Sequence, residues 1–106
     1  MNIRTETKDG AAIVRIDGEV DMLESPKLRG VLMRLVDEET PVIAVDLKGV
    51  DFMDSAGIAT LVECYQGVKR YEGAFKLLAP NKRVRGAISL ARLDRVFEIV
   101  DDESGL

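Results

Sequence analysis

Asp54 and Ser55 stand at the start of a stretch with helical periodicity. Apolar side chains recur on one face of this predicted helix, at Ile58, Leu61, Val62, Tyr65 and Val68. The first backbone amides of a helix lack partners within the helix and carry the positive end of its dipole. The hydroxyl of Ser55 is therefore predicted to lie where a phosphate group would be tolerated.

The neighbours of Ser55 bear on this interpretation. Asp54 offers a rival helix cap, and an arbitrary Asp-Ser pair before an apolar periodic run is most often a simple cap. Gly57 would let another backbone come close to the first turn, although glycine inside a helix costs about 1 kcal/mol. A glycine at this unfavourable position indicates that the first turn of the helix has a functional role.

Other reactive groups in the sequence favour simpler interpretations. Asp46, Asp51 and Asp54 could hold magnesium as in a receiver domain, but the chain opens with a hairpin and is short for five βα units. We interpret them as solvated loop carboxylates. Cys64 lies beside the inward stripe of the predicted helix, with no histidine in the chain to activate it. It is predicted to be a small buried apolar group.

Two further groups of side chains are candidates for a surface role. The basic residues of the last third are interpreted as a solvated face; they are Lys82, Arg83, Arg85, Arg92 and Arg95. Four apolar residues near Ser55 are either loop anchors or an exposed patch that a partner covers, and both interpretations stay open. They are Met22, Leu23, Phe52 and Met53.

Length and composition limit the classes of function. A chain of 106 residues, 46% apolar and 32% charged, fits one globular domain, residues 1–106. A net charge of -4 argues against nucleic-acid binding. No apolar run reaches the roughly 20 residues of a membrane span, and no signal-peptide-like stretch opens the chain, so we expect a cytoplasmic protein. Residues 101–106 are predicted to be a frayed acidic tail.

The elements that must position Ser55 follow from the pattern of apolar residues. Strands are predicted at 3–7, 12–16, 42–45, 74–78 and 97–100; Asp9-Gly10 turns the first hairpin, and Ser25 and Asn81 cap the first and third helices. The order is ββαβαβαβ, an α/β fold with a mixed, mostly parallel sheet, an N-terminal antiparallel hairpin and three to four helices. Ligand-facing loops lie at the carboxyl ends of parallel strands, which singles out the 46–55 loop.

Three segments, in their order and spacing, carry a family resemblance. They are Gly18 to Asp21, Val45 to Gly57 and Leu90 to Phe97. From Ile3 to Val100 the chain resembles the STAS domain family, specifically the bacterial anti-sigma factor antagonists. Their central motif is usually Asp-Ser-Ser-Gly or Asp-Ser-Ala-Gly after an aromatic residue, which Phe52 to Gly57 matches. Ala56 leaves Ser55 as the only hydroxyl in the motif, and the short tail indicates a short or missing final helix.

The resemblance implies a phosphorylation switch. Ser55 would be phosphorylated by a partner that is both an anti-sigma factor and a serine kinase. The unphosphorylated form would bind this partner and free a sigma factor; phosphorylation would release the partner until a phosphatase resets the switch. The chain would be substrate and ligand, with no catalysis of its own and no cofactor. The implied partner-binding residues are Asp21, Met22, Phe52, Met53, Asp54, Ser55, Ala56 and Gly57.

Two other classes of function remain as alternatives. A STAS subunit of a lipid-transport or stress-sensing assembly would use the domain as a structural or interaction module, with Ser55 as a docking residue. A small enzyme is disfavoured because the sequence contains no histidine and no glycine-rich Lys-Ser/Thr nucleotide loop. The sequence leaves the oligomeric state open.

Overall fold

The computed structural model describes all residues from Met1 to Leu106. Its elements are, in chain order, β1 (Asn2–Lys8), β2 (Ala11–Val20), α1 (Ser25–Asp37), β3 (Val42–Met53), α2 (Ser55–Arg70), β4 (Ala74–Leu78), α3 (Lys82–Leu90), β5 (Glu98–Val100) and the 3-10 turn η1 (Glu103–Gly105). The predicted order ββαβαβαβ is confirmed. None of the helices has the length and apolarity needed to cross a membrane.

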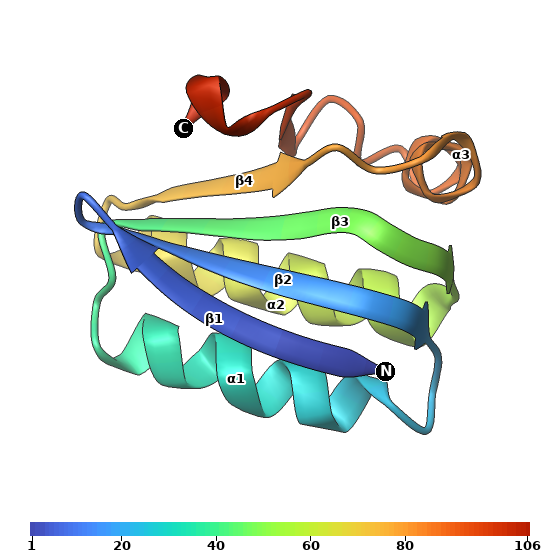
Figure 1. Ribbon diagram of the computed structural model, residues 1–106, viewed down its shortest axis with the longest axis horizontal. Helices are drawn as coiled ribbons and strands as arrows, with labels where there is room; N and C mark the ends of the chain where they lie inside the picture. The colour runs from blue at the N-terminus through green and yellow to red at the C-terminus, as the bar shows by residue number, and fades with distance from the viewer.

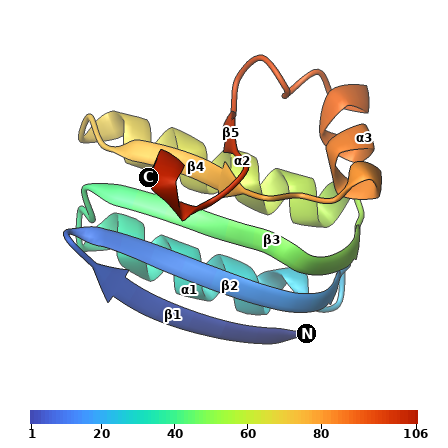
Figure 2. The same cartoon turned by 45° about the horizontal axis from the view of Figure 1, so that its top comes forward.

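The five strands form one mixed sheet in the order β1-β2-β3-β4-β5 (Figure 2). β1 pairs antiparallel with β2, and every other neighbouring pair is parallel. Asp9 and Gly10 form the two-residue turn between β1 and β2, with φ angles of 52° and 81°. Positive φ at both central residues is the type I′ geometry that suits a hairpin, so the predicted Asp-Gly turn is confirmed.

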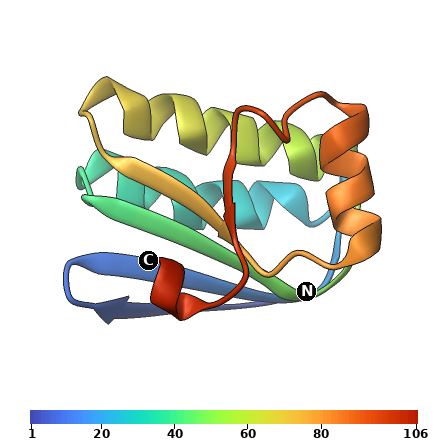
Figure 3. The ribbon, with the colours of Figure 1, turned by 90° about the horizontal axis from the view of Figure 1, so that it is seen from above.

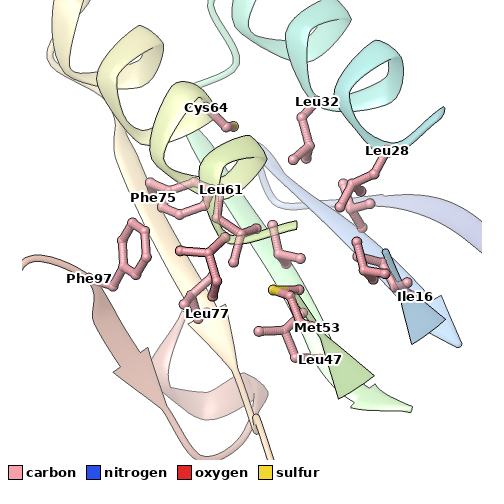
Figure 4. Close-up of a cluster of buried hydrophobic side chains, with 14 of the residues drawn as sticks. Ile16, Leu28, Leu32, Leu47, Met53, Leu61, Cys64, Phe75, Leu77 and Phe97 are labelled. Carbon is pink, nitrogen blue, oxygen red and sulfur yellow. The ribbon is translucent and has the colours of Figure 1, made fainter. Parts of the chain in front are cut away.

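One face of the sheet is covered by α1 and α2, and α3 lies at one end of the sheet beside the start of α2 (Figure 1). Alternate side chains of β2, β3 and β4 meet the inward faces of the helices in a single core cluster of 20 buried residues. Figure 4 shows part of this core, in which Leu61, Phe75 and Leu77 lie together between α2 and β4. Cys64 also belongs to this cluster, as predicted.

β3 is longer than predicted. The sequence suggested a loop from Asp46 onward, but the strand continues to Met53 and stays paired with β2. The register between the two strands shifts twice, between Arg15 and Asp17 and between Gly18 and Glu19. Such bulges change which side chains face the core, so the buried residues of this half no longer alternate. The predicted 46–55 loop is therefore a bulged strand.

The helix starts agree only in part with prediction. Ser25 is not the cap of α1: it is the first helical residue and is buried, and the N-cap is Glu24. Asn81 caps α3 as predicted, because its side chain accepts a hydrogen bond from the amide of Val84. The side-chain Nδ2 of Asn81 also donates a hydrogen bond to the backbone carbonyl of Val50 at 2.8 Å, which ties α3 to β3.

The acidic tail, predicted to be frayed, instead folds across the second face of the sheet (Figure 3). Three cations hold it there. Arg15 on β2 pairs with Glu103, Lys76 on β4 donates to the carbonyl of Gly105 at 2.9 Å, and Arg85 pairs with Asp101 at 3.1 Å. The prediction missed these contacts because the cations lie far away in the sequence. The short turn η1 stands where a final helix was expected to be short or missing.

Arg15 is the central cation of this second face. It pairs with Glu6 at 3.0 Å and with the buried Asp46 at 2.8 Å, in addition to Glu103. The hydrogen bonds to Glu6, Glu103 and Asp46 raise the pKa of Arg15 above its ordinary value. The tail therefore docks on a fixed positive charge.

Candidate functional site

The candidate site lies at the end of the sheet where β2 and β3 finish. The amide of Asp54 donates to the carbonyl of Val20 at 3.1 Å, which joins the last residue of β2 to the start of α2. The loop 21–24 leaves β2 at the same place and leads into α1. Residues far apart in sequence, Asp21 and Ser55 among them, are thus brought to one edge, as the rule for parallel sheets predicts.

Asp54 is the N-cap of α2. Its Oδ1 accepts hydrogen bonds from the amides of Ala56 at 2.9 Å and Gly57 at 3.1 Å, and its Oδ2 accepts one from the amide of Met22 at 3.0 Å. Asp54 therefore occupies two amides of the first turn that were expected to be free near Ser55. A phosphate on Ser55 would therefore lie near the carboxylate of Asp54, whereas the sequence predicted free backbone amides there.

Ser55 is the first residue of α2 and is exposed. Its hydroxyl is not used by the fold, because no hydrogen bond within the chain involves it. Thr60, one turn further along the same helix, contrasts with it: the Thr60 hydroxyl is buried and donates to the carbonyl of Ala56 at 3.1 Å. The Ser55 hydroxyl is accessible to an external reagent.

Asp21 organises the loop that adjoins Ser55. Its Oδ1 accepts hydrogen bonds from the amides of Leu23 at 3.0 Å and Glu24 at 2.9 Å, and its backbone carbonyl accepts from Ser25 at 2.8 Å. Asp21 is half-buried. It shapes the loop and the start of α1, and it makes no hydrogen bond with Asp54 or Ser55.

The apolar residues around Ser55 divide into two kinds by their burial. Met22 is 73% exposed, Leu23 85% and Phe52 39%, whereas Met53 is only 3% exposed and belongs to the core. Three of the four are therefore surface residues, and Met53 is an anchor.

Gly57 is buried and acts as a point of close approach. A Cβ at this position would lie 2.6 Å from Cγ of Met53 and 3.0 Å from the carbonyl oxygen of Val20. Any side chain would push α2 away from the ends of β2 and β3. The glycine in the first turn is thus explained by packing inside the site, and Ala56 beside it is half-buried.

Leu90 is a surface residue that the sequence analysis did not single out. It is 89% exposed at the end of α3. It borders an open hollow of about 310 Å³ whose other lining residues are Met53, Asp54, Ser55, Ile58, Ala87 and Ala91. Its position in the sequence could have indicated this exposure. Leu90 lies outside the predicted inward stripe of α3, where a large apolar side chain has no core to enter.

The alternative chemistries gain no support from the geometry. Asp46 is buried and paired with Arg15, and no group of three or more acidic, cysteine or histidine side chains is arranged to hold a metal ion. Cys64 is fully buried, and this burial raises its pKa to about 12. A thiol held in its protonated form is a poor nucleophile. Of the basic residues around α3, Arg85 is the one that forms an ion pair.

Comparison with known proteins agrees with this geometry. Residues 2–105 match the family described as STAS domain. The anti-sigma-B factor antagonist of Staphylococcus aureus is 32% identical over 100 residues, which cover 93% of this chain and 83% of that protein. The anti-sigma-B factor antagonist of Bacillus subtilis is 27% identical over 107 residues, which cover 99% of this chain and 97% of that protein. The crystal structure of an anti-sigma factor antagonist from Mycobacterium paratuberculosis matches with a TM-score of 0.90 at 28% identity, over 98% of this chain and 88% of that one. The chain therefore belongs to the STAS domain family.

Proposed function

We propose that this chain is an anti-sigma factor antagonist that binds an anti-sigma factor through the surface around Ser55. The observation that carries the proposal is the free, exposed hydroxyl of Ser55 beside exposed apolar side chains. The names of the relatives, which are anti-sigma factor antagonists, support the same function.

The binding region is an apolar surface centred on a polar group. Five large apolar side chains of the chain are exposed, and four of them belong to segments that adjoin Ser55: Met22, Leu23, Phe52 and Leu90. We call these four residues together with Ser55 the Ser55 surface. Exposed apolar side chains gathered in one region are typical of protein interaction sites. An anti-sigma factor docked here would cover the Ser55 hydroxyl.

Phosphorylation of Ser55 would switch this interaction off. The Ser55 oxygen would accept the phosphoryl group of ATP from an anti-sigma factor with serine kinase activity, and ADP would leave. The product carries about -1.5 to -2 charges at pH 7. Because Asp54 already occupies the amides of Ala56 and Gly57, the phosphate would lie next to a carboxylate without these donors. A partner would have to bury both charges, so it is released; a phosphatase then restores the hydroxyl.

The test is a pull-down from the native cell extract with intact-mass analysis of the bait. The variants are wild type, Ser55→Ala and Ser55→Asp, and Ser104→Asp places the same charge on the exposed tail turn, away from the Ser55 surface. We expect wild type, Ser55→Ala and Ser104→Asp to retain an anti-sigma factor and Ser55→Asp to lose it. One phosphate should appear on wild type and Ser104→Asp and be absent from Ser55→Ala.

A different result would identify the alternative role. If all four proteins retain the same transport or stress-sensing components and none gains a phosphate, the domain is an interaction module of such an assembly. Ser55 would then be a docking residue without a switch, and the proposal would be wrong.

A further inference from the structure

The exposed edge of β1 is the one long unpaired strand edge of the sheet. β1 pairs with β2 on one side only and spans seven residues, whereas the opposite edge strand, β5, has three. All of β1 except Ile3 is exposed, and its pairing with β2 contains no register shift and no proline. An open hollow of about 660 Å³ lies between Thr5 of β1 and residues of α1 and its C-cap. Such an edge is a template for another strand.

The hairpin turn fixes which backbone groups of β1 point outward. A type I′ turn is closed by a hydrogen bond between its first and fourth residues, here Lys8 and Ala11. Hydrogen-bonded and non-hydrogen-bonded pairs alternate along an antiparallel ladder. Lys8, Glu6, Arg4 and Asn2 therefore direct their backbone groups toward β2. The groups of Ile3, Thr5 and Thr7 point away from the sheet and are free to bond a second strand.

We propose that β1 of one copy pairs antiparallel with β1 of a second copy, in a two-fold symmetric register centred on Thr5, so that two sheets join into one. In this register the whole strand overlaps, from Asn2 opposite Lys8 to Lys8 opposite Asn2. Thr5 faces Thr5, and Ile3 faces Thr7. These are the residues with outward backbone groups, so each such pair exchanges two hydrogen bonds.

The side chains of β1 are complementary in the same register. Arg4 lies opposite Glu6 of the second copy, and Glu6 lies opposite Arg4. Within one chain Arg4 forms no ion pair, and its direct neighbour on β2 is another cation, Arg15. Glu6 belongs to a group of three carboxylates that share the single guanidinium of Arg15. Pairing would place Glu6 of the second copy opposite Arg4, and it would bring a second cation to the three carboxylates around Arg15. Opposite charges that face each other across two strands stabilise the pairing.

The occupant favoured by this pattern is a second copy, because an unrelated strand would have no reason to repeat the charges in reverse order. The net charge of -4 opposes self-association, but repulsion is screened beyond about 8 Å at physiological salt, so contacts at the strand decide the outcome. One pair of edge strands buries little area compared with a standard interface of about 800 Å² per partner. The dimer is therefore weak and reversible. This inference does not depend on the proposed function.

Sedimentation velocity over a wide range of protein concentration tests the pairing. We expect a concentration-dependent dimer for wild type. Arg4→Glu and Glu6→Arg should each weaken it at least about tenfold, because symmetry places like charges opposite each other twice. The double variant Arg4→Glu/Glu6→Arg restores both pairs and should recover the dimer. Arg83→Glu, the same charge change at an exposed residue of α3, is the matched control and should leave dimerisation unchanged.

Cross-linking tests the register itself. Thr5→Cys would place two thiols at the two-fold axis, within reach of a short bifunctional maleimide, whereas Thr7→Cys would hold them about 14 Å apart along the strand. We expect a rapid covalent dimer from Thr5→Cys and a slow one from Thr7→Cys; the buried Cys64 serves as an internal blank. A wild type that stays monomeric at every concentration, a double variant that fails to recover, or equal cross-linking of both cysteine variants would each overturn the proposal.

Discussion

The side chain of Asp54 accepts a hydrogen bond from the backbone amide of Met22 at 3.0 Å. The same carboxylate caps α2 through Ala56 and Gly57. One side chain therefore fixes the position of the loop after β2 relative to the first turn of the helix. Because Met22 and Ser55 both belong to the Ser55 surface, the shape of this surface depends on Asp54.

Asp54→Ala should destabilise the protein by about 1 to 2 kcal/mol, because it removes the cap of α2 and the bond to Met22. Asp54→Asn keeps an oxygen that can cap the helix, and it should cost much less. Urea unfolding followed by circular dichroism measures both. Equal losses for Ala and Asn would mean that the negative charge, and not the cap, is what the site requires.

Gly57→Ala should destabilise the protein although alanine is the better helix former. The new Cβ would lie 2.6 Å from Cγ of Met53, closer than real Cβ atoms come, and at a tight 3.0 Å from Val20. Gly86→Ala is the matched control, because a Cβ on this exposed residue of α3 meets nothing within 4 Å. It should stabilise the protein by up to about 1 kcal/mol. Thermal unfolding of the two variants should therefore move the melting temperature in opposite directions.

Arg15→Ala should cost about 3 kcal/mol, because it leaves the buried carboxylate of Asp46 without its cation. Glu103→Ala removes a partner whose side chain is 43% exposed and should cost less than about 1 kcal/mol. The free energies of unfolding in urea give the comparison. Similar losses from the two variants would show that tail docking, rather than the burial of Asp46, dominates the stability of this face.

The buried thiol of Cys64 predicts a loss of stability at alkaline pH. Burial raises its pKa from 9.0 to about 12, so between these values the folded chain holds a proton that the unfolded chain releases. Stability is full below pH 9 and falls as the pH rises through this window, by about 1 kcal/mol from pH 9 to pH 10. Burial also raises the pKa of Tyr71, from 10.0, so the test belongs below pH 10.

Cys64→Ala provides the comparison for this pH dependence. It should lower the overall stability, because it leaves a small cavity, but it should flatten the decline between pH 9 and pH 10. Urea unfolding at each pH measures the slope. An unchanged slope in Cys64→Ala would assign the decline to another group.

The order of elements could be predicted from local patterns alone. The Asp9-Gly10 turn, the Asn81 cap and the inward stripe of α2 each depend on residues close together in the chain, and the structure confirms them. The second half of β3 could not be predicted in this way. Its bulges replace the alternation of a regular strand, so Leu47, Val50 and Met53 enter the core at intervals of three.

The features of the site that prediction missed depend on contacts between distant segments. Asp and Ser both cap helices, so the sequence alone allows either Asp54 or Ser55 to cap α2. The amides of Ala56 and Gly57 bond to Asp54, which makes Asp54 the cap. The further bond from Met22 to the same carboxylate joins segments 32 residues apart, and no local pattern reports it. Likewise, the place of Leu90 beside Ser55 and the docking of the tail on the sheet depend on residues that are distant in the sequence.

The ion pair between Arg15 and Glu103 joins residues 88 positions apart. During synthesis Arg15 can reach Glu6 and Asp46 long before Glu103 has been made, and closing so long a loop is entropically costly. We therefore expect the tail to dock last, onto a sheet that is already assembled. The guanidinium of Arg15 would thus pair first with Glu6 and Asp46, which are nearer in the chain, and last with Glu103.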